Sequence, residues 1–381
     1  MTTFLYLIEA DLTSGATRCA LELVKRLKNT DFRPIVVTQH KNDFNDVCNQ
    51  LGIENYHFHY ARICSLGMGF IGWLIAFFTH TFLNFLALKY LEKKIDFKNI
   101  SFIHSNGSSI DFGAYLHKKK NITHIWHVRD FFLFDGTWRP LVKNFPLYLE
   151  KNSTKVVTVS KSLEEHLVKN GCSPQKVRTI YDGIDINSEQ KRTARLSSTK
   201  ELLHVACVGQ ICRSKGQETL VDAIIQMTET ERSHFVFDFY GELKPDVKDV
   251  ILDKIIKHKL GKIVVFKGYS KNILHDLNNY DIGVQPSHSE GFSRVTAEYM
   301  AAGLCVIAAK EGAIPELIQH NENGLLYEDF NSTELKDQLN FCFQNQEKMH
   351  ALAKNAQAKF FNNYDIEINV RKILELYQSM S

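Results

Sequence analysis

The chain has 381 residues, of which 44% are hydrophobic and 23% are charged. These values are typical of a globular protein and argue against extensive disorder or a fibrous repeat, while the length exceeds what one hydrophobic core usually supports, so two domains are expected. The net charge of +3 is too small to indicate a nucleic-acid-binding protein, which usually carries a concentrated basic face.

The cysteines and the N-terminus favour a reducing compartment. Eight cysteines are scattered along the chain without C-x-x-C pairs or short metal-ligand spacings, so we interpret them as reduced core residues. The first residues, "MTTFLYLIEADLTSG", lack a basic region and a small-residue cleavage site, and their apolar run has the length of a strand. We therefore expect a cytoplasmic protein.

Short apolar runs occur in two series. They are rich in Val, Ile and Phe and alternate with amphipathic stretches, which is typical of parallel βα units with helices on both faces of a sheet. The first series is "FLYLIEA", "RPIVVTQH", "ISFIHSN", "THIWHV", "KVVTV" and "VRTIYDGID"; the second is "LLHVACVGQ", "FVFDFYG", "KIVVFKG", "DIGVQPS", "LCVIAAK" and "GLLY". The sequence predicts an α/β protein with two doubly wound parallel sheets.

A polar segment separates the two series. Residues 187–200, "NSEQKRTARLSSTK", have no apolar period and suit an exposed linker between domains. This places one domain at residues 1–186 and the other at 201–364. Residues 365–381 have apolar positions at helical spacing, which predicts a C-terminal helix that docks back on the N-terminal domain.

The stretch from Leu66 to Lys94 is unusually apolar and approaches membrane-spanning length. Polar residues interrupt it and no second span accompanies it, so a transmembrane helix is not predicted. Two interpretations stay open: a buried helix, or a helix whose apolar face contacts lipid while nearby lysines meet headgroups. The lysines favour peripheral membrane contact through Leu66 to Leu88.

In a doubly wound sheet, ligands bind beyond the carboxyl ends of the strands, where helix N-termini present N–H groups to anions. After the first predicted strand, Thr13 or Ser14 would cap a helix. Gly15 would let a phosphate approach the backbone closely, although a glycine there is as often only a turn.

The second domain opens with a basic loop, "VGQICRSKGQ". Arg213 and Lys215 lie near the start of the next helix, where two cations could hold a diphosphate against the helix dipole. The alternative is two solvated basic residues. We favour the binding role because clefts form at strand-to-helix loops.

Two glutamates flank a predicted helix start in "SHSEGFSRVTAEYMAAG". A helix from about Ser293 to Gly303 places Glu290 ahead of the N-terminus and Glu298 in the second turn. Their spacing corresponds to at most about 12 Å. Glu290 would accept hydrogen bonds from a sugar and Glu298 from a ribose, while the N–H groups of Gly291, Phe292 and Ser293 would meet the phosphates. Solvating charge on a surface helix is the alternative.

These residues carry a resemblance. The region beginning at Ser287, with its E-x7-E pair at Glu290 and Glu298, resembles the donor-site signature of the family 4 glycosyltransferases. The basic loop resembles the family's phosphate loop, with Gln210 where many members have an arginine. "THIWHVRDFF" resembles the family's strand-end histidine motif, whereas the rest of the N-terminal half matches more loosely.

The resemblance implies a GT-B fold, two Rossmann-like domains facing across a cleft, and retaining transfer of a sugar from a nucleotide sugar. It implies Glu290 on the donor hexose, Glu298 on the ribose, Lys215 with Arg213 on the diphosphate, and His127 at the reaction centre. The alternative for His127 is a hydrogen-bonded histidine at a domain edge.

No D-x-D motif is present, and His57 and His59 have no carboxylate or cysteine at ligand spacing. We therefore expect no metal and no cofactor; the cations and the helix N-terminus would stabilise the leaving nucleoside diphosphate. UDP-sugars are the favoured donors, and a saccharide or lipid-linked saccharide of a bacterial surface-polysaccharide pathway is the favoured acceptor.

Two other functions compete with this prediction. A sugar-nucleotide epimerase or nicotinamide dehydrogenase could use a similar fold, but a dehydrogenase should show G-x-G-x-x-G after its first strand and an acid about twenty residues later; neither half does. A non-catalytic partner subunit of another transferase is the second rival. The presence of Glu290, Glu298 and Lys215 speaks against it.

Overall fold

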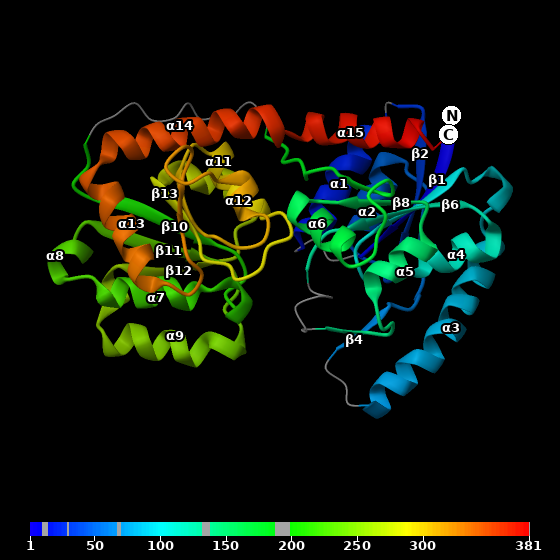
Figure 1. Ribbon diagram of the computed structural model, residues 1–381, viewed down its shortest axis with the longest axis horizontal. Coiled ribbons are helices and arrows are strands. Elements are labelled where there is room, and N and C mark those ends of the chain that lie inside the picture. The colour runs from blue at the N-terminus through cyan, green and yellow to red at the C-terminus, as the bar shows by residue number, and fades with distance from the viewer. Residues whose placement is uncertain (10–13, 29, 67–69, 132–137, 187–198, 381) are drawn as a thin grey trace. The chain divides into compact units, whose positions relative to one another are not determined.

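The computed structural model describes residues 1–9, 14–28, 30–66, 70–131, 138–186 and 199–380. The chain divides into two compact units, shown in Figure 1. Unit 1 contains residues 1–183 and 366–381, and unit 2 contains residues 184–365. The predicted linker, 187–200, lies outside the described residues except for its last two positions.

Unit 1 is built on a seven-stranded parallel sheet with the order β3-β2-β1-β5-β6-β8-β9. The strand order reverses between β1 and β5, the kind of position at which such sheets bind ligands. The strands are β1 (Thr2–Ile8), β2 (Phe32–Thr38), β3 (Asn55–His57), β5 (Phe102–Asn106), β6 (Thr123–Val128), β8 (Lys155–Thr158) and β9 (Val177–Thr179).

Helices cover both faces of this sheet. Successive residues of β1 point to opposite faces: Phe4, Tyr6 and Ile8 join one core cluster, and Leu5 and Leu7 join another. The helices are α1 (Gly15–Leu27), α2 (Asp43–Leu51), α3 (Phe70–Glu92), α4 (Phe112–Lys120), α5 (Phe145–Asn152), α6 (Lys161–Lys169) and α15 (Ile366–Gln378), with the 3-10 turn η1 (Phe97–Asn99). A separate antiparallel pair joins β4 (Cys64–Leu66) and β7 (Trp138–Pro140).

The C-terminal helix α15 packs on unit 1, although unit 2 precedes it in the sequence. Its Tyr377 ring lies 4.9 Å from both Phe4 and Phe102, measured between ring centroids. Val370, Ile373 and Leu376 complete the same core cluster, which also holds the buried face of α1. The last helix is therefore part of the core of the first unit.

Unit 2 contains a six-stranded parallel sheet with the order β12-β11-β10-β13-β14-β15, which reverses between β10 and β13. Its strands are β10 (Leu203–Val208), β11 (Phe235–Tyr240), β12 (Val264–Gly268), β13 (Ile282–Gln285), β14 (Cys305–Ala309) and β15 (Leu325–Tyr327). Its helices are α7 (Gln217–Gln226), α8 (Glu229–Arg232), α9 (Pro245–Lys257), α10 (Ile273–Asp276), α11 (Arg294–Ala301), α12 (Ile314–Leu317), α13 (Ser332–Gln344) and α14 (Gln346–Asn363), with η3 (Arg213–Lys215), η4 (Leu260–Lys262) and η5 (Leu277–Asn279). The two doubly wound parallel sheets confirm the predicted fold class.

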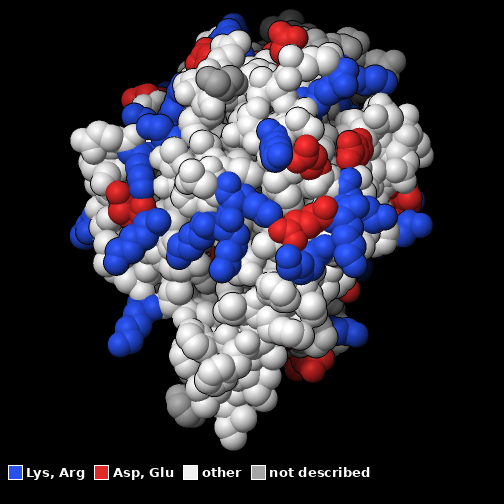
Figure 2. Space-filling model, turned by 90° about the vertical axis from the view of Figure 1, so that its right-hand side faces the viewer, with Lys and Arg blue, Asp and Glu red and all other residues white. Residues whose placement is uncertain are grey.

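Helix α3 projects from unit 1 (Figure 1). Figure 2 shows its N-terminal half as a white projection below a band of basic side chains. By length and composition, residues Ile71–Glu92 could cross a membrane. Of the two interpretations left open for this stretch, the buried helix does not hold for the first half, because none of the residues 71–83, all of which are described, is buried. From Asn84 onward the helix does contribute buried residues: Asn84, Ala87, Leu88 and Leu91.

Candidate functional site

The basic loop of unit 2 follows β10 and contains η3, which carries both predicted cations. Gly216, directly after η3, has φ 66°, a left-handed conformation that favours glycine. A Cβ at this position would lie 1.8 Å from the carbonyl oxygen of Pro286. Glycine therefore lets the basic loop lie directly against the end of β13.

Hydrogen bonds join this loop to the segment after β13. The backbone N–H of His288 donates to the carbonyl of Ser214 across 3.1 Å, and the Ser287 hydroxyl donates to the same carbonyl across 3.3 Å. Because β10 and β13 are neighbours in the sheet, the loops at their carboxyl ends meet. The structure thereby brings together two predicted parts of the donor site.

Lys215 and Glu290, both predicted to bind the donor, form a direct ion pair in which Nζ lies 2.7 Å from Oε1. Gln285, at the end of β13, donates its side-chain N–H to the same carboxylate oxygen across 2.9 Å. Burial lowers the pKa of Lys215, but attraction to the Glu290 carboxylate outweighs this effect and raises that pKa above its ordinary value. Lys215 therefore stays charged, with 33% of its side chain exposed.

The backbone of Glu290 is held from the other side by the turn before α12. The N–H of Ala313 donates to the Glu290 carbonyl across 2.9 Å. Gly312 has φ 55°, and a Cβ there would lie 2.3 Å from the same carbonyl oxygen. A second glycine thus permits the close packing that positions the Glu290 loop.

Helix α11 begins at Arg294, one residue after the predicted start. Gly291, Phe292 and Ser293 lie just before its first turn, and Ser293 has φ 67°. The Phe292 ring is buried and packs edge-on against Tyr364, with centroids 5.7 Å apart. The aromatic side chain anchors the loop whose backbone is predicted to meet the phosphates.

Glu298 lies in α11 and is 3% exposed. Its Oε1 accepts a hydrogen bond from Arg294 Nε across 3.0 Å, an (i, i+4) pair on one helix face. This partner was not singled out in the sequence, although the spacing could have indicated it. The carboxylate predicted to bind the ribose is therefore also one half of a largely buried ion pair.

Arg213 differs from Lys215 in its surroundings. Its backbone N–H donates to Asp246 across 3.1 Å, and its side chain is exposed. Both Arg213 and Lys215 lie on η3. Of these two cations, Lys215 is the one that pairs with Glu290.

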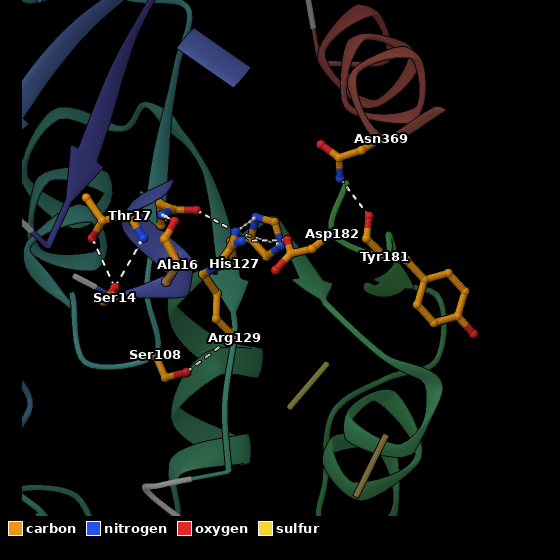
Figure 3. A network of polar contacts seen from close by, with 10 residues as sticks. Ser14, Ala16, Thr17, Ser108, His127, Arg129, Tyr181, Asp182 and Asn369 are labelled. Carbon is orange, nitrogen blue, oxygen red and sulfur yellow. Dashed lines mark hydrogen bonds and ion pairs between the residues drawn. The ribbon is translucent and has the colours of Figure 1, made fainter. Parts of the chain in front are cut away.

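A second cluster of polar residues, around the predicted His127, lies at the carboxyl edge of the unit 1 sheet. Ile8, Asn106 and His127 are in register across β1, β5 and β6. Arg129 joins them: its Nη1 donates to Asn106 Oδ1 across 2.8 Å, and its Nη2 lies 2.5 Å from Asp182 Oδ1 (Figure 3). Arg129, Asn106 and Asp182 were not predicted as a set, because they come from segments far apart in the sequence.

His127 is buried, and Arg129 Nη1 lies 3.4 Å from its Nδ1. Its ring stacks on His104, with centroids 5.4 Å apart, and His104 in turn contacts the Tyr377 hydroxyl of α15 across 2.7 Å. Burial, together with the positive charge of Arg129, holds the pKa of His127 well below its ordinary value. The imidazole is therefore neutral near pH 7.

Gly15 is exposed at the N-terminus of α1. Ser14 caps this helix, because its side chain accepts a hydrogen bond from the N–H of Thr17. Ser14 was one of the two predicted caps; the other, Thr13, lies outside the described residues. Asn106 Nδ2 donates to the carbonyl of Ala16 across 3.4 Å. The start of α1 is thus linked to the His127 cluster, as Figure 3 shows.

No group of three or more His, Cys, Asp or Glu side chains suited to a metal ion occurs among the residues that the structure describes. The cysteines in that part of the chain are all free thiols, and all but Cys212 are buried.

Comparison with known proteins gives matches to both halves of the chain. The family model described as "Glycosyltransferase Family 4" matches residues 13–188, and "Glycosyl transferases group 1" matches residues 188–359. An uncharacterized glycosyltransferase of Methanocaldococcus jannaschii is 26% identical over 96% of this chain and 95% of its own length. The amylovoran biosynthesis glycosyltransferase AmsK of Erwinia amylovora is 24% identical over 63% of this chain and 59% of its own length.

Among solved structures, Anabaena HepE in complex with UDP-glucose superposes with a TM-score of 0.79 and 21% identity, covering 100% of both chains. This likeness confirms the two-domain GT-B fold. The paired family models, together with the parallel sheets and the resemblance around Glu290, show that the chain belongs to the family 4 glycosyltransferases of the group 1 type.

Proposed function

We propose that this glycosyltransferase moves a sugar from a nucleotide sugar, preferably a UDP-sugar, to a saccharide or lipid-linked saccharide with retention of configuration. The observation that carries the proposal is the Lys215–Glu290 pair, which lies at the end of β13 and just ahead of the α11 N-terminus. One cation, one carboxylate and one helix start are thereby grouped at a strand edge. The cation and the helix N-terminus can bind a phosphate, and the carboxylate can accept a hydrogen bond from a sugar hydroxyl.

On the donor side, Lys215 and Arg213 would bind the diphosphate, with the N–H groups of Gly291, Phe292 and Ser293. Glu290 would accept hydrogen bonds from the sugar and Glu298 from the ribose. Gly15, at the start of α1, would leave room for the phosphates. In these roles the cations and the helix N-terminus stabilise the negative charge that develops as the nucleoside diphosphate leaves, so no metal or other cofactor is required.

At the reaction centre, loss of the diphosphate would leave an oxocarbenium-like sugar, which an acceptor hydroxyl attacks from the same face. The leaving phosphate would take the acceptor proton. A neutral His127 suits this step, because an uncharged imidazole can hydrogen-bond to the sugar without repelling the developing positive charge. Its low pKa supports that protonation state.

Two of the relatives support the choice of substrates. HepE was solved with UDP-glucose, which supports a UDP-sugar donor. AmsK is named for the biosynthesis of amylovoran, which supports a role in cell-surface polysaccharide synthesis. If the acceptor is lipid-linked, the protein would work at the cytoplasmic face of the cell membrane.

The test is release of nucleoside diphosphate from a panel of UDP- and GDP-sugars, with and without extracted bacterial lipids. We expect release with one donor, an increase with lipid, and a loss of about a hundredfold or more in Glu290→Ala. Glu322→Ala, which removes an exposed carboxylate of unit 2, is the matched control and should keep full activity.

A protein that binds nucleotide but releases none from any donor would contradict the proposal and favour a non-catalytic partner subunit. Conversion of one nucleotide sugar into another without an acceptor would favour the epimerase. The anomeric configuration of the product, read by NMR, tests retention separately.

A further inference from the structure

Helix α3 carries a stripe of exposed apolar side chains, here called the α3 stripe. Its members alternate at spacings of four and three residues, so they lie on one face of the helix. Each is between 44% and 73% exposed. The α3 stripe consists of Ile71, Ile75, Phe78, Phe82 and Phe85.

Other faces of this helix half also carry apolar side chains, alongside the exposed Thr79 and Thr81. Phe77 is 48% exposed, and its ring stacks on Trp73 with centroids 5.5 Å apart. The sequence contains no Asp, Glu, Lys or Arg between Arg62 and Lys89. An exposed apolar surface of this extent marks an interaction site, because water-exposed helices usually carry charges on at least one face.

The second half of α3 is fixed to unit 1. The Asn84 side chain accepts a hydrogen bond from the N–H of Ala61 across 3.0 Å, and His80 forms a 2.7 Å ion pair with the buried Asp111. Leu88 and Leu91 belong to a core cluster. Residues 71–83, here called the α3 tip, contain no buried residue, and the His80 pair with Asp111 lies near the end of this range.

The length of the α3 tip decides between spanning a membrane and entering it. At the rise of an α-helix, residues 71–83 cover about 20 Å. The hydrocarbon core of a bilayer is about 30 Å thick. The tip is therefore too short to cross, but it is long enough to enter one leaflet while the rest of unit 1 remains outside.

Basic residues lie where headgroups would meet the protein. The end of α3, the segment after it and the end of α4 contain seven lysines and two acids: Lys89, Lys93, Lys94, Lys98, Lys118, Lys119 and Lys120, with Glu92 and Asp96. Glu92 pairs with Lys89 and Lys120, and the other lysines leave a net positive surface. Figure 2 shows the basic band directly above the white projection.

We propose that the α3 tip inserts into one leaflet of a membrane with anionic headgroups, and that the lysines contact those headgroups. This inference goes beyond the proposed function, since it identifies a membrane-docking surface that does not depend on the sugar transferred. The apolar tip and the basic band together match the two layers of such a membrane.

A second copy of the chain is the main competing occupant, because four-three spacing also suits a coiled-coil seam. A coiled coil normally flanks that seam with charged residues. The α3 tip has none, and its apolar side chains extend around the helix. Lipid is the environment that accommodates all of these faces at once.

The experiment measures binding of the full chain to sucrose-loaded vesicles of phosphatidylcholine, with and without about 30% phosphatidylglycerol. We expect binding that needs the anionic lipid and is reversed by alkaline carbonate. Ile75→Ser/Phe78→Ser/Phe82→Ser should lower the partition coefficient at least about a hundredfold. Lys93→Gln/Lys94→Gln should lower it about fivefold per lysine, and only with anionic vesicles.

Ile256→Ser is the matched control, because Ile256 is 74% exposed on α9 of unit 2 and should leave binding unchanged. Brominated lipids should quench Trp73 fluorescence, and Trp73→Phe should remove that quenching. Thermal melting checks that each variant folds, and the nucleotide-release assay reports the proposed function separately.

Absence of vesicle binding, or binding that the triple variant retains, would overturn the inference. Retention after carbonate treatment would indicate a spanning helix instead. A dimer in light scattering without lipid, lost in the triple variant, would show that a second copy covers the α3 stripe.

Discussion

Lys215 and Glu290 lie 75 positions apart in the sequence, yet the lysine Nζ donates to the glutamate Oε1 across 2.7 Å. A diphosphate that binds Lys215 must compete with this carboxylate or share the ammonium group with it. The donor site thus couples the group predicted to bind phosphate with the group predicted to bind sugar.

Lys215→Ala should weaken UDP binding about tenfold to a hundredfold, because a hydrogen bond to a charged group contributes about 1.5–3 kcal/mol. Isothermal titration calorimetry measures the change. Lys215→Arg, which keeps the charge, should lose less. Lys248→Ala removes an exposed lysine of α9 and serves as the control; equal affinities for wild type and Lys215→Ala would remove Lys215 from the donor site.

Gly312→Ala should lower kcat/KM for glycosyl transfer by about tenfold or more, because the added Cβ would displace the backbone of Glu290. Gly261→Ala adds the same methyl group where nothing lies within 4 Å and should leave activity intact. Steady-state kinetics on both variants makes the comparison. Full activity in Gly312→Ala would show that the Glu290 loop tolerates the shift.

Glu298→Ala should destabilise the fold by at most about 3–5 kcal/mol, because it removes the carboxylate half of a largely buried ion pair with Arg294. Urea unfolding measures this loss. The double variant Arg294→Met/Glu298→Leu should recover most of the stability. If the double variant also recovers UDP affinity, the ribose role of Glu298 is wrong; if affinity stays low, that role is supported.

Acid should destabilise unit 1 below about pH 6.5. Burial lowers the pKa of His104 and His124 to about 3 and that of His127 well below its usual value. Above pH 6.5 these groups are neutral in both states; below it, the unfolded chain takes up protons that the folded chain does not. Each histidine then removes about 1.4 kcal/mol per pH unit.

His80 affects stability in the opposite direction. Burial lowers its pKa, but the ion pair with Asp111 raises it above its ordinary value, so protonation of His80 stabilises the folded state and offsets part of the stability that the other histidines lose in acid. Melting temperatures between pH 7.5 and pH 5 measure the slope, and these limits are about one pH unit above and about one and a half pH units below the histidine pKa. His124→Asn should flatten the slope, whereas His275→Asn, at an exposed position, should not. An unchanged melting temperature across that range would contradict the assignment.

The fold was predictable because its buried strands are continuous apolar runs separated by amphipathic helices. The strands β4 and β7 were not predicted, because they form a separate antiparallel pair and no continuous apolar run marks them. The buried face of α1 follows directly from helical spacing in the sequence: Cys19, Ala20, Leu23, Val24 and Leu27 are all buried.

The site was predictable only where its residues are close in sequence. Helix geometry placed Glu290 before α11 and Glu298 within it, but the Lys215–Glu290 contact depends on β10 and β13 being neighbours. The Arg129–Asp182 pair likewise joins segments that only the folded chain brings together. For α3, composition left a buried helix and a lipid-facing helix open, since exposure is a property of the surrounding structure.

The position of α15 has a consequence for biosynthesis. The core of unit 1 requires Ile373 and Tyr377, which lie in a helix that is synthesised after all of unit 2. Unit 2 is complete in sequence before that helix emerges. We therefore expect the second unit to fold first during translation, while the nascent first unit remains unfinished until α15 has emerged from the ribosome.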